Sequence, residues 1–377
     1  MTAVGPVSID MYLPGFPAIE RDFAARGVEG SMAAFMIGLA VGQLLYGPIS
    51  DRFGRKPPLY VGLIVYTLGS LGCALSVNMT MLIGMRIVQA LGGCAGMVIG
   101  RAIVRDRCEP HEAARAFTTL MLIVALGPVL APAIGGVIVT LFGWRATFVF
   151  QAVLGMVLLV AMHRVLSESH DVRNAAAMSV PNVLRNYVQL ARDRHFIAYS
   201  LLLGFSMASM FSYVTGAPRV ITENYGLSPQ QFGWLIGLNG LMFMSASLLN
   251  MRALRTLGPR QVLARYVWMS PLLGMVLLIS STLLKMPLWA VVALQLAFFL
   301  GVGRVNPNVS ALALAPHGRN AGTASALMGA TQSALTTCGG LAVAIFNDGT
   351  VRTLAAIMTS GAVLAFLCYL WARRVDS

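Results

Sequence analysis

Charged residues are scarce in this sequence of 377 residues. Only 11% of its residues are Asp, Glu, Lys or Arg, whereas 57% are hydrophobic, and the mean hydropathy is +0.74. A soluble domain normally carries about twice that charged fraction, because polar side chains must cover its surface. The shortage excludes an ordinary soluble protein and indicates that lipid surrounds most of the chain.

Acidic residues are scarcer than basic ones: the sequence has 14 Asp and Glu against 27 Lys and Arg, which gives a net charge of +13. A nucleic-acid-binding module would gather its basic residues with aromatic ones on one soluble face. Here the basic residues fall in short gaps between apolar runs, a pattern typical of membrane topology. We therefore expect the lipid bilayer, and no nucleic acid, as a partner.

Metal and redox motifs are also missing. The five cysteines are dispersed and have neither metal-ligand nor redox spacing, so we interpret them as small buried hydrophobic residues. His163 and His317 lie near the ends of apolar runs without a second ligand in helical register. We expect no metal site and no cofactor.

Long apolar runs are what the sequence has instead. About 20 apolar residues cross the bilayer core as a helix, and the chain holds eleven runs of that kind after a shorter one at 1–19. They lie at 31–50, 58–77, 80–104, 115–141, 144–164, 196–218, 229–250, 265–284, 287–311, 320–345 and 352–372. The sequence predicts an all-α membrane protein with many spans.

The first span is short. Nine residues precede Asp10, which is ~14 Å of helix and reaches from mid-membrane to one surface. We expect this helix to be truncated, with the natural start upstream of the first residue shown.

The distribution of basic residues predicts the orientation. Eighteen of the 27 lysines and arginines fall in alternate gaps that begin at 51–56, six fall in the other gaps, and three lie within spans. Positive gaps stay in the cytoplasm, so both termini are expected there. The polar stretch 167–195 divides the chain into a bundle at 1–166 and a bundle at 196–377, the arrangement of a duplicated transporter.

Asp10 is the only acid well inside an apolar segment. A charge at membrane depth is costly, so such a residue predicts a function. Burial favours the neutral form of a carboxyl group, which suits it to exchange protons. The alternative is a carboxylate permanently paired with an arginine.

Arg86 lies within the span 80–104, on the same helical face as Gln89 and Gly93. Because a guanidinium keeps its proton, Arg86 either tunes Asp10 or binds an anionic group. A purely structural, hydrogen-bonded arginine is the alternative.

Two further segments carry unusual patterns. The gap at 47–56 is short and turn-forming, with an acid beside a basic cluster, which suits contacts that form in one state of a two-state cycle. The span 115–141 contains two prolines and three glycines within 127–136, which should bend it and let a neighbouring helix approach closely.

At these motifs the sequence resembles the drug:proton antiporters of the major facilitator superfamily. The gap at 47–56, the Arg86-x-x-Gln89-x-x-Gly92 stretch and the glycine–proline segment 127–136 are similar to three of its motifs. Within that superfamily, the sequence resembles the bicyclomycin/chloramphenicol resistance (Bcr/CflA) subfamily in particular. That likeness rests on Ile9–Pro14, Arg101–Asp106, Tyr225–Gly233, Ala313–Pro316 and Ala321–Ala326.

The resemblance implies the major facilitator fold, with twelve helices in two six-helix bundles, and proton-driven drug export by alternating access across a bacterial inner membrane. It implies that Asp10 couples transport to protons, with Arg86 nearby. The conformational gate would comprise Gly47, Asp51, Arg52, Gly54, Arg55, Arg101 and Asp106. The antiporter motif would comprise Gly127, Pro128, Gly135 and Gly136.

Several alternatives stay open. Tyr12, Gln89, Phe205, Tyr213 and Asn239 are candidate substrate-binding residues, but they do not identify the substrate, and we expect a monomer. A proton-coupled uptake symporter or a metabolite exporter could use the same fold. An intramembrane enzyme would need paired acids, a metal or an activated nucleophile, and a passive channel would need no titratable carboxyl group.

Overall fold

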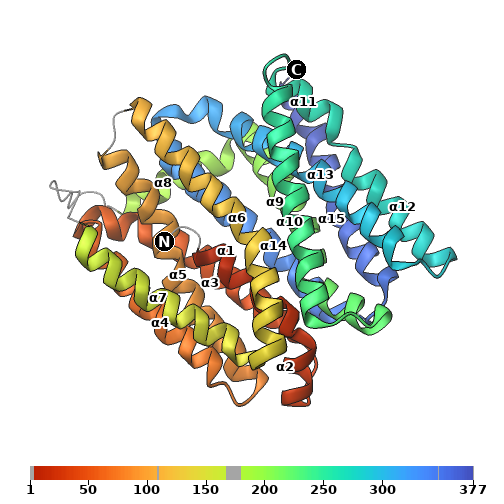
Figure 1. Cartoon of the computed structure of the whole chain (residues 1–377). Coiled ribbons are helices and arrows are strands. Elements are labelled where there is room, and N and C mark those ends of the chain that lie inside the picture. Colours follow the sequence, from red (N-terminus) through yellow and green to blue (C-terminus); the bar gives the residue numbers. More distant parts are fainter. Residues whose placement is uncertain (1–3, 108–109, 167–179, 347, 377) are drawn as a thin grey trace. The chain divides into compact units, whose positions relative to one another are not determined.

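The computed structural model describes residues 4–107, 110–166, 180–346 and 348–376, and these residues form helices joined by short connections (Figure 1). The first part comprises α1 (Val4–Asp10), η1 (Leu13–Gly15), α2 (Phe16–Phe23), α3 (Glu29–Phe53), α4 (Lys56–Ala74), α5 (Met79–Arg107), α6 (Pro110–Phe142) and α7 (Arg145–Val165). The second part comprises α8 (Val180–Arg192), α9 (Arg194–Tyr225), α10 (Pro229–Ala253), α11 (Pro259–Tyr266), α12 (Met269–Leu283), α13 (Leu288–Leu314), η3 (Ala315–Asn320), α14 (Ala321–Phe346) and α15 (Val351–Asp376).

The predicted all-α membrane fold is confirmed. Over the described residues, nine helical segments are long and apolar enough to cross a membrane, and a shorter apolar helix runs over Leu126–Phe142. The predicted first span differs, because the chain leaves the helix after Asp10 and re-enters it through η1 into α2. Pro14 and Pro17 lie at this break, and each lacks the N–H that a continuous helix would use.

The ends of α9 show how local sequence sets the helices. Asp193 precedes the helix, and its side chain accepts hydrogen bonds from the backbone N–H groups of His195 (2.9 Å) and Phe196 (3.3 Å). This N-cap satisfies donors that the first turn leaves unpaired. At the other end Gly226 adopts a left-handed conformation with φ +66°, which glycine reaches without a steric cost.

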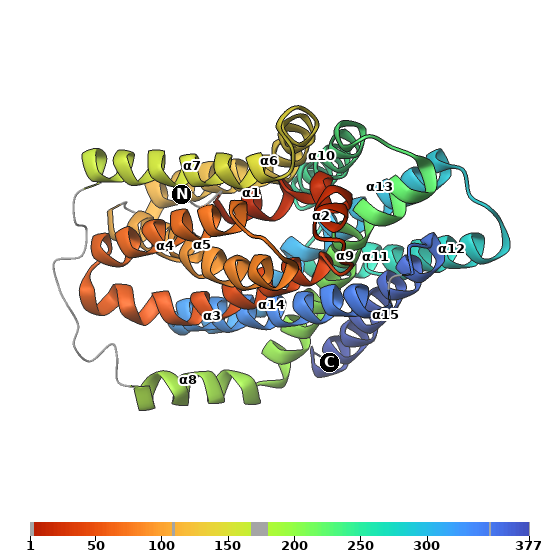
Figure 2. The same ribbon diagram turned by 90° about the horizontal axis from the view of Figure 1, so that it is seen from below.

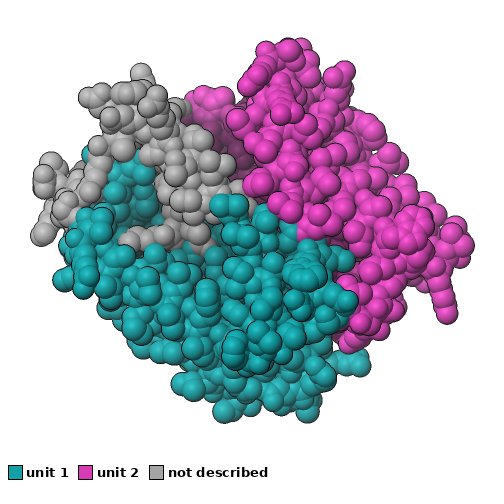
Figure 3. All heavy atoms as spheres, in the orientation of Figure 1, with its two compact units in different colours: residues 1–184, 228–237 teal, residues 185–227, 238–377 magenta. Residues whose placement is uncertain are grey.

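The helices form two compact units (Figure 3). Unit 1 comprises residues 1–184 and 228–237, and unit 2 comprises residues 185–227 and 238–377. The boundary of the two units near residue 184 falls within the predicted linker, while residues 229–237 at the start of α10 belong to unit 1.

Close helix approach holds unit 1 together. The helices α4, α5 and α7 lie side by side in two perpendicular views (Figures 1 and 2), with α4 in contact with both of the others. A Cβ atom at Gly92 of α5 would overlap the backbone of Tyr66 on α4. Small residues of this kind let membrane helices pack backbone to backbone.

Unit 2 is built around α9, which packs against α13, α14 and α15. Its apolar core includes Phe196, Leu202, Val309 and Met328. The packing of α14 on α9 again requires a glycine, since a Cβ at Gly339 would lie 2.9 Å from the carbonyl oxygen of Ala208.

Candidate proton-coupling and transport site

Arg86 lies in the interior of unit 1, on α5, and its side chain is fully buried. Its guanidinium carbon lies 4.2 Å from the ring centre of Tyr12 and 4.1 Å from that of Phe35, and the ring of Phe148 is 5.8 Å away. Aromatic faces stabilise a cation by their quadrupole, most strongly where water is excluded. Three rings therefore take the place of water around this charge.

A hydrogen-bond network extends from the same guanidinium. Its Nη1 donates to the backbone carbonyl of Ser8 (3.0 Å) and to Oε1 of Gln89 (2.6 Å). The Nε2 of Gln89 donates in turn to Ser70 (2.8 Å) and Gln151 (2.7 Å). The network thereby joins α1, α4, α5 and α7.

The charge of Arg86 is not neutralised by this network. Its acceptors are a backbone carbonyl and an amide, both uncharged. In the part of the chain that the structure describes, the Nε and Nη2 atoms of Arg86 have no hydrogen-bond partner. A buried cation without a counter-ion is costly, so this arrangement favours the approach of a negative group.

Asp10 ends α1, two residues after Ser8, and only 6% of its surface is exposed. Across the described ranges, no hydrogen bond or ion pair reaches its carboxyl group. The structure therefore brings the backbone of α1 to Arg86, through Ser8, and leaves the Asp10 carboxyl group unpaired.

The glycines and prolines of α6 position α1. Pro128 lies within the helix, and Gly127 faces Pro6 of α1, where a Cβ would lie 2.8 Å from the Pro6 side chain. A Cβ at Gly135 would overlap the carbonyl oxygen of Met11, the residue after Asp10. This segment of α6 thus holds the chain on both sides of the buried acid.

Gly136 serves a different contact in unit 1. A Cβ at this position would lie 2.7 Å from the carbonyl oxygen of Pro229, at the start of α10. The predicted antiporter motif therefore lies at two close approaches of helix backbones, one to α1 and one to α10.

The candidate substrate residues divide between the units. Tyr12 and Gln89 are fully buried in the Arg86 network of unit 1. In unit 2, the Nδ2 of Asn239 donates to the hydroxyl of Tyr213 at 3.5 Å, and both residues are 2% exposed. Phe205 is partly buried and packs against the core of unit 2.

The predicted gate centres on Arg55, which follows the turn at Gly54 (φ +88°). Its Nε donates to Asp106 on α5 at 2.7 Å, and its Nη1 donates to Ser50 at 2.9 Å. The side chain of Arg55 is only 2% exposed, which strengthens this ion pair because little water screens it.

The other gate candidates are close to Arg55 or Asp106 in the sequence. Arg52 lies over the ring of Phe53 at 5.2 Å, and a Cβ at Gly47 would meet open space. The side chains of Asp51 and Arg101 lie outside the part that the structure describes.

Sequence reasoning missed several members of the site. Ser8, Phe35, Tyr66, Phe148 and Gln151 all belong to the buried surroundings of Arg86. Gln151 could have been noticed as a lone amide in an apolar run, whereas the aromatic residues give no signal among so many hydrophobic neighbours.

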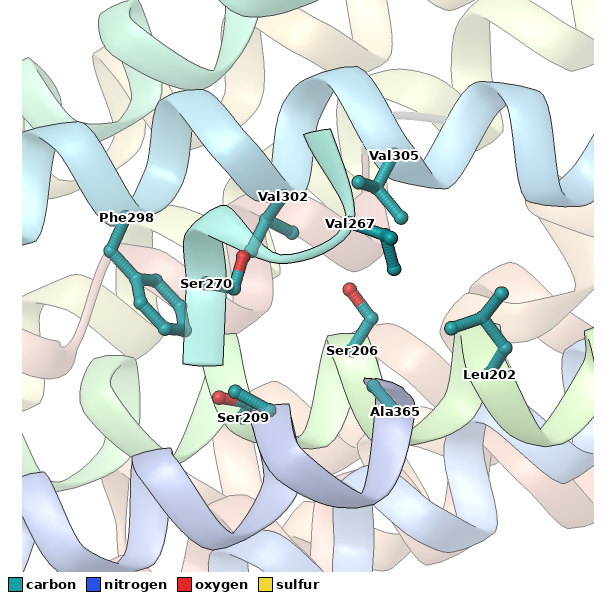
Figure 4. Close-up of a pocket in the computed structure, with 10 residues that line it drawn as sticks. Leu202, Ser206, Ser209, Val267, Ser270, Phe298, Val302, Val305 and Ala365 are labelled. Carbon is teal, nitrogen blue, oxygen red and sulfur yellow. The ribbon is translucent and has the colours of Figure 1, made fainter. Parts of the chain in front are cut away.

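Unit 2 contains a small cavity between α9, α12, α13 and α15 (Figure 4). Its volume is about 10 Å³, the space of one water molecule, and Ser206, Ser209 and Ser270 provide its polar atoms. Ser206 donates to Asn306 (2.8 Å), and Ser209 donates to the carbonyl of Met358 (2.5 Å). Drug-sized ligands need several hundred Å³, so this cavity is not their binding site.

Comparison with known proteins identifies the family. The model of the Major Facilitator Superfamily matches residues 1–341. The chain is 34% identical to the uncharacterized MFS-type transporter YdgK of Bacillus subtilis, over 98% of this chain and 92% of that protein. It is 30% identical to a bicyclomycin resistance protein homolog of Haemophilus influenzae, over 98% and 93% of the two chains. It is 28% identical to multidrug resistance protein D of Escherichia coli, with the same coverage.

Solved structures share the fold. A bacterial homolog of the human lysosomal transporter Spinster, in an inward-facing and occupied conformation, has a TM-score of 0.76 at 14% identity, over 100% of this chain and 94% of that one. The peptide transporter POT in complex with alafosfalin has a TM-score of 0.76 at 16% identity, over 99% and 93%. These proteins are transporters rather than enzymes. The chain belongs to the major facilitator superfamily and is a multi-pass inner-membrane transporter of small molecules. Within that superfamily it is similar to members of the Bcr/CflA subfamily.

Proposed function

We propose that this chain exports small hydrophobic or amphipathic drugs from the bacterial cytoplasm in exchange for protons, by alternating access. The observation that carries the proton coupling is Asp10, a buried carboxyl group at the end of α1 that has no partner among the described residues. The names of the relatives, which include bicyclomycin and multidrug resistance proteins, support drugs as the substrate class.

In this proposal Asp10 carries the proton. A carboxylate that is buried without a partner is costly, so the empty site takes up a proton when it opens to the outside. Release toward the cytoplasm needs a compensating positive charge, and Arg86 is a permanent, fully buried cation of the same unit. Arg86 contacts α1 through the backbone carbonyl of Ser8, and in this proposal a shift of α1 brings the Asp10 carboxyl group to the guanidinium.

The remaining candidate residues take the other roles. The candidate drug-binding residues are Tyr12 and Gln89 in unit 1 and Phe205, Tyr213 and Asn239 in unit 2. The ion pair of Arg55 with Asp106, together with Asp51 and Arg101, closes the cytoplasmic side. Both termini face the cytoplasm, the working unit is a monomer, and the proton gradient replaces a cofactor.

The test is Asp10→Asn in inverted membrane vesicles with an imposed pH gradient. We expect drug uptake into the vesicles to be lost while the amount of protein stays unchanged, since an amide cannot exchange a proton. Asp348→Asn is the matched control, because Asp348 is an exposed acid between α14 and α15, and it should transport normally. Normal drug uptake by Asp10→Asn would refute the coupling role.

Direction is tested in whole cells. Adding an uncoupler should raise the accumulation of a chloramphenicol-like drug, because an exporter then loses its driving force. A fall in accumulation would favour the uptake symporter instead. A resistance profile in a pump-deficient host would then separate drugs from metabolites as substrates.

A further inference from the structure

The last residue of α15, Asp376, lies at the centre of a polar cluster in unit 2. Its carboxylate accepts from Nδ1 of His195 at 2.7 Å and from the hydroxyl of Tyr199 at 2.8 Å. Nη2 of Arg260, on α11, lies 3.1 Å from the same carboxylate. The side chain of Asp376 is 12% exposed and that of His195 is 19% exposed, so water has little access to the contact.

His195 is held at both ring nitrogens. While Nδ1 faces Asp376, Nε2 lies 3.0 Å from the backbone carbonyl of Leu312, near the end of α13. A carboxylate and a carbonyl are both acceptors and neither has a proton to donate. A neutral imidazole carries one N–H and would place a lone pair against one of these oxygens. Only the doubly protonated ring satisfies both contacts.

The charges around this ring come from every element that packs on it. On α9 they are Asp193, Arg194 and His195 itself, and on α11 the charge is Arg260. The segment η3 contributes His317, whose Nε2 lies 3.2 Å from the carboxylate of Asp193. The last turn of α15 contributes Arg373 and Arg374 in addition to Asp376. Among these groups, Asp376 is the acid that contacts the ring of His195, while Asp193 contacts its backbone N–H.

We propose that His195 is a second proton-binding site of this transporter, separate from Asp10, and that its proton fastens the end of α15 to the ends of α9, α11 and α13. Loss of that proton removes one of the two contacts of His195 and weakens the cluster. In the proposed orientation this end of unit 2 faces the cytoplasm, so the site reports the cytoplasmic pH.

The sign of the effect follows from the geometry. Both contacts of the folded ring need an N–H group, so a neutral ring keeps only one of them. The contribution of His195 to stability is therefore present at low pH and is lost as pH rises. The experiment therefore covers about pH 5 to 8, the range over which histidine side chains in proteins change charge.

The experiment measures thermal unfolding of the purified full chain in lipid nanodiscs from pH 5.5 to 8.5. We expect the unfolding temperature of the wild type to fall with pH by roughly 2–4 °C more than that of His195→Gln. Asp376→Asn should lose the same share of the pH dependence. His163→Gln is the matched control, because His163 hydrogen-bonds to Tyr60 in unit 1, and it should keep the wild-type slope. Equal slopes in the wild type and His195→Gln would overturn the proposal.

A measurement that does not need His195→Gln decides the matter if that variant does not fold. With ¹⁵N-labelled histidine, one of the five histidines should show both ring nitrogens protonated at pH 7, and that signal should change in Asp376→Asn. Five neutral rings at pH 7 would contradict the proposal. Neither readout uses transport, so the outcome is independent of whether the chain exports drugs.

Discussion

Each unit places an arginine over a tyrosine ring, but the surroundings of the two arginines differ. In unit 1, Arg86 is fully buried between Tyr12 and Phe35. In unit 2, Arg304 lies 4.3 Å from the ring of Tyr266 and is only partly buried. The first side chain is wholly enclosed by protein, whereas the second is partly exposed, and its Nε atom is buried without a hydrogen-bond partner among the described residues.

The acids differ in the same way. Unit 1 contains Asp10, buried within an apolar segment, while the four acids of unit 2, Asp193, Glu223, Asp348 and Asp376, all lie at helix ends or between helices. The buried polar groups of unit 2 are mainly amides and hydroxyls, such as Asn239 and Tyr213. The comparison shows that the described part of unit 1 encloses both a fully buried arginine and a buried acid, whereas the buried polar groups of unit 2 are mainly neutral.

The largest expected effect comes from exchanging the two arginines for lysine. Arg86→Lys keeps the charge but loses the planar contact with two rings and the hydrogen bonds to Ser8 and Gln89. A buried cation–π contact is worth about 2 kcal/mol, so we expect transport to fall by at least about tenfold. Arg304→Lys should change transport less than about threefold. Equal losses in the vesicle assay would end the distinction between the units.

The second effect concerns the contact that holds α1. Gly135→Ala forces the Met11 carbonyl and the adjacent Asp10 to move, and overpacking of this kind costs about 1–3 kcal/mol. Gly84→Ala, on α5 of the same unit, meets nothing within 4 Å and should be neutral or slightly stabilising because alanine favours a helix. Thermal unfolding and vesicle transport measure both variants. Normal transport by Gly135→Ala would mean that α1 is not positioned by α6.

The smallest expected effect is the change in stability with acid that two exposed aspartates, Asp22 and Asp348, produce. The hydrogen bond from Arg145 holds the pKa of Asp22 below its ordinary 3.8 in unit 1. In unit 2, partial burial opposes the shift, but hydrogen bonds from Thr350 keep the pKa of Asp348 below 3.8 as well. A carboxyl group whose pKa is lower in the folded protein than in the unfolded chain stabilises the folded state at pH values above its unfolded pKa of about 4. This stabilisation is lost as the pH falls through the pKa of the folded state.

Arg145→Gln and Thr350→Val should each remove a small part of that acid sensitivity. Unfolding temperatures between pH 6 and pH 3 measure it, and the loss should be smaller than either effect above because Asp22 is exposed to solvent. If a variant loses more stability in acid than the wild type does, then these contacts do not stabilise the charged form of Asp22 or Asp348.

The sequence alone determined that this chain is a bundle of membrane helices, because hydropathy and the spacing of basic residues depend on composition and local order. It also identified Asp10 and Arg86, since a charge inside an apolar run is visible without a structure. It could not show the break after Asp10, where the helix stops, and it placed Glu29 in a gap although that side chain is 1% exposed.

Only the tertiary structure decided which groups meet. Arg86 contacts Ser8 and lies among three aromatic rings rather than against Asp10, and His195 contacts Asp376, which is 181 positions away in the chain. Such contacts depend on how helices far apart in sequence pack side by side, and the identity of a residue does not carry that information. The physical reason is that hydrophobic burial is non-directional, whereas hydrogen bonds and ion pairs require specific distances and angles.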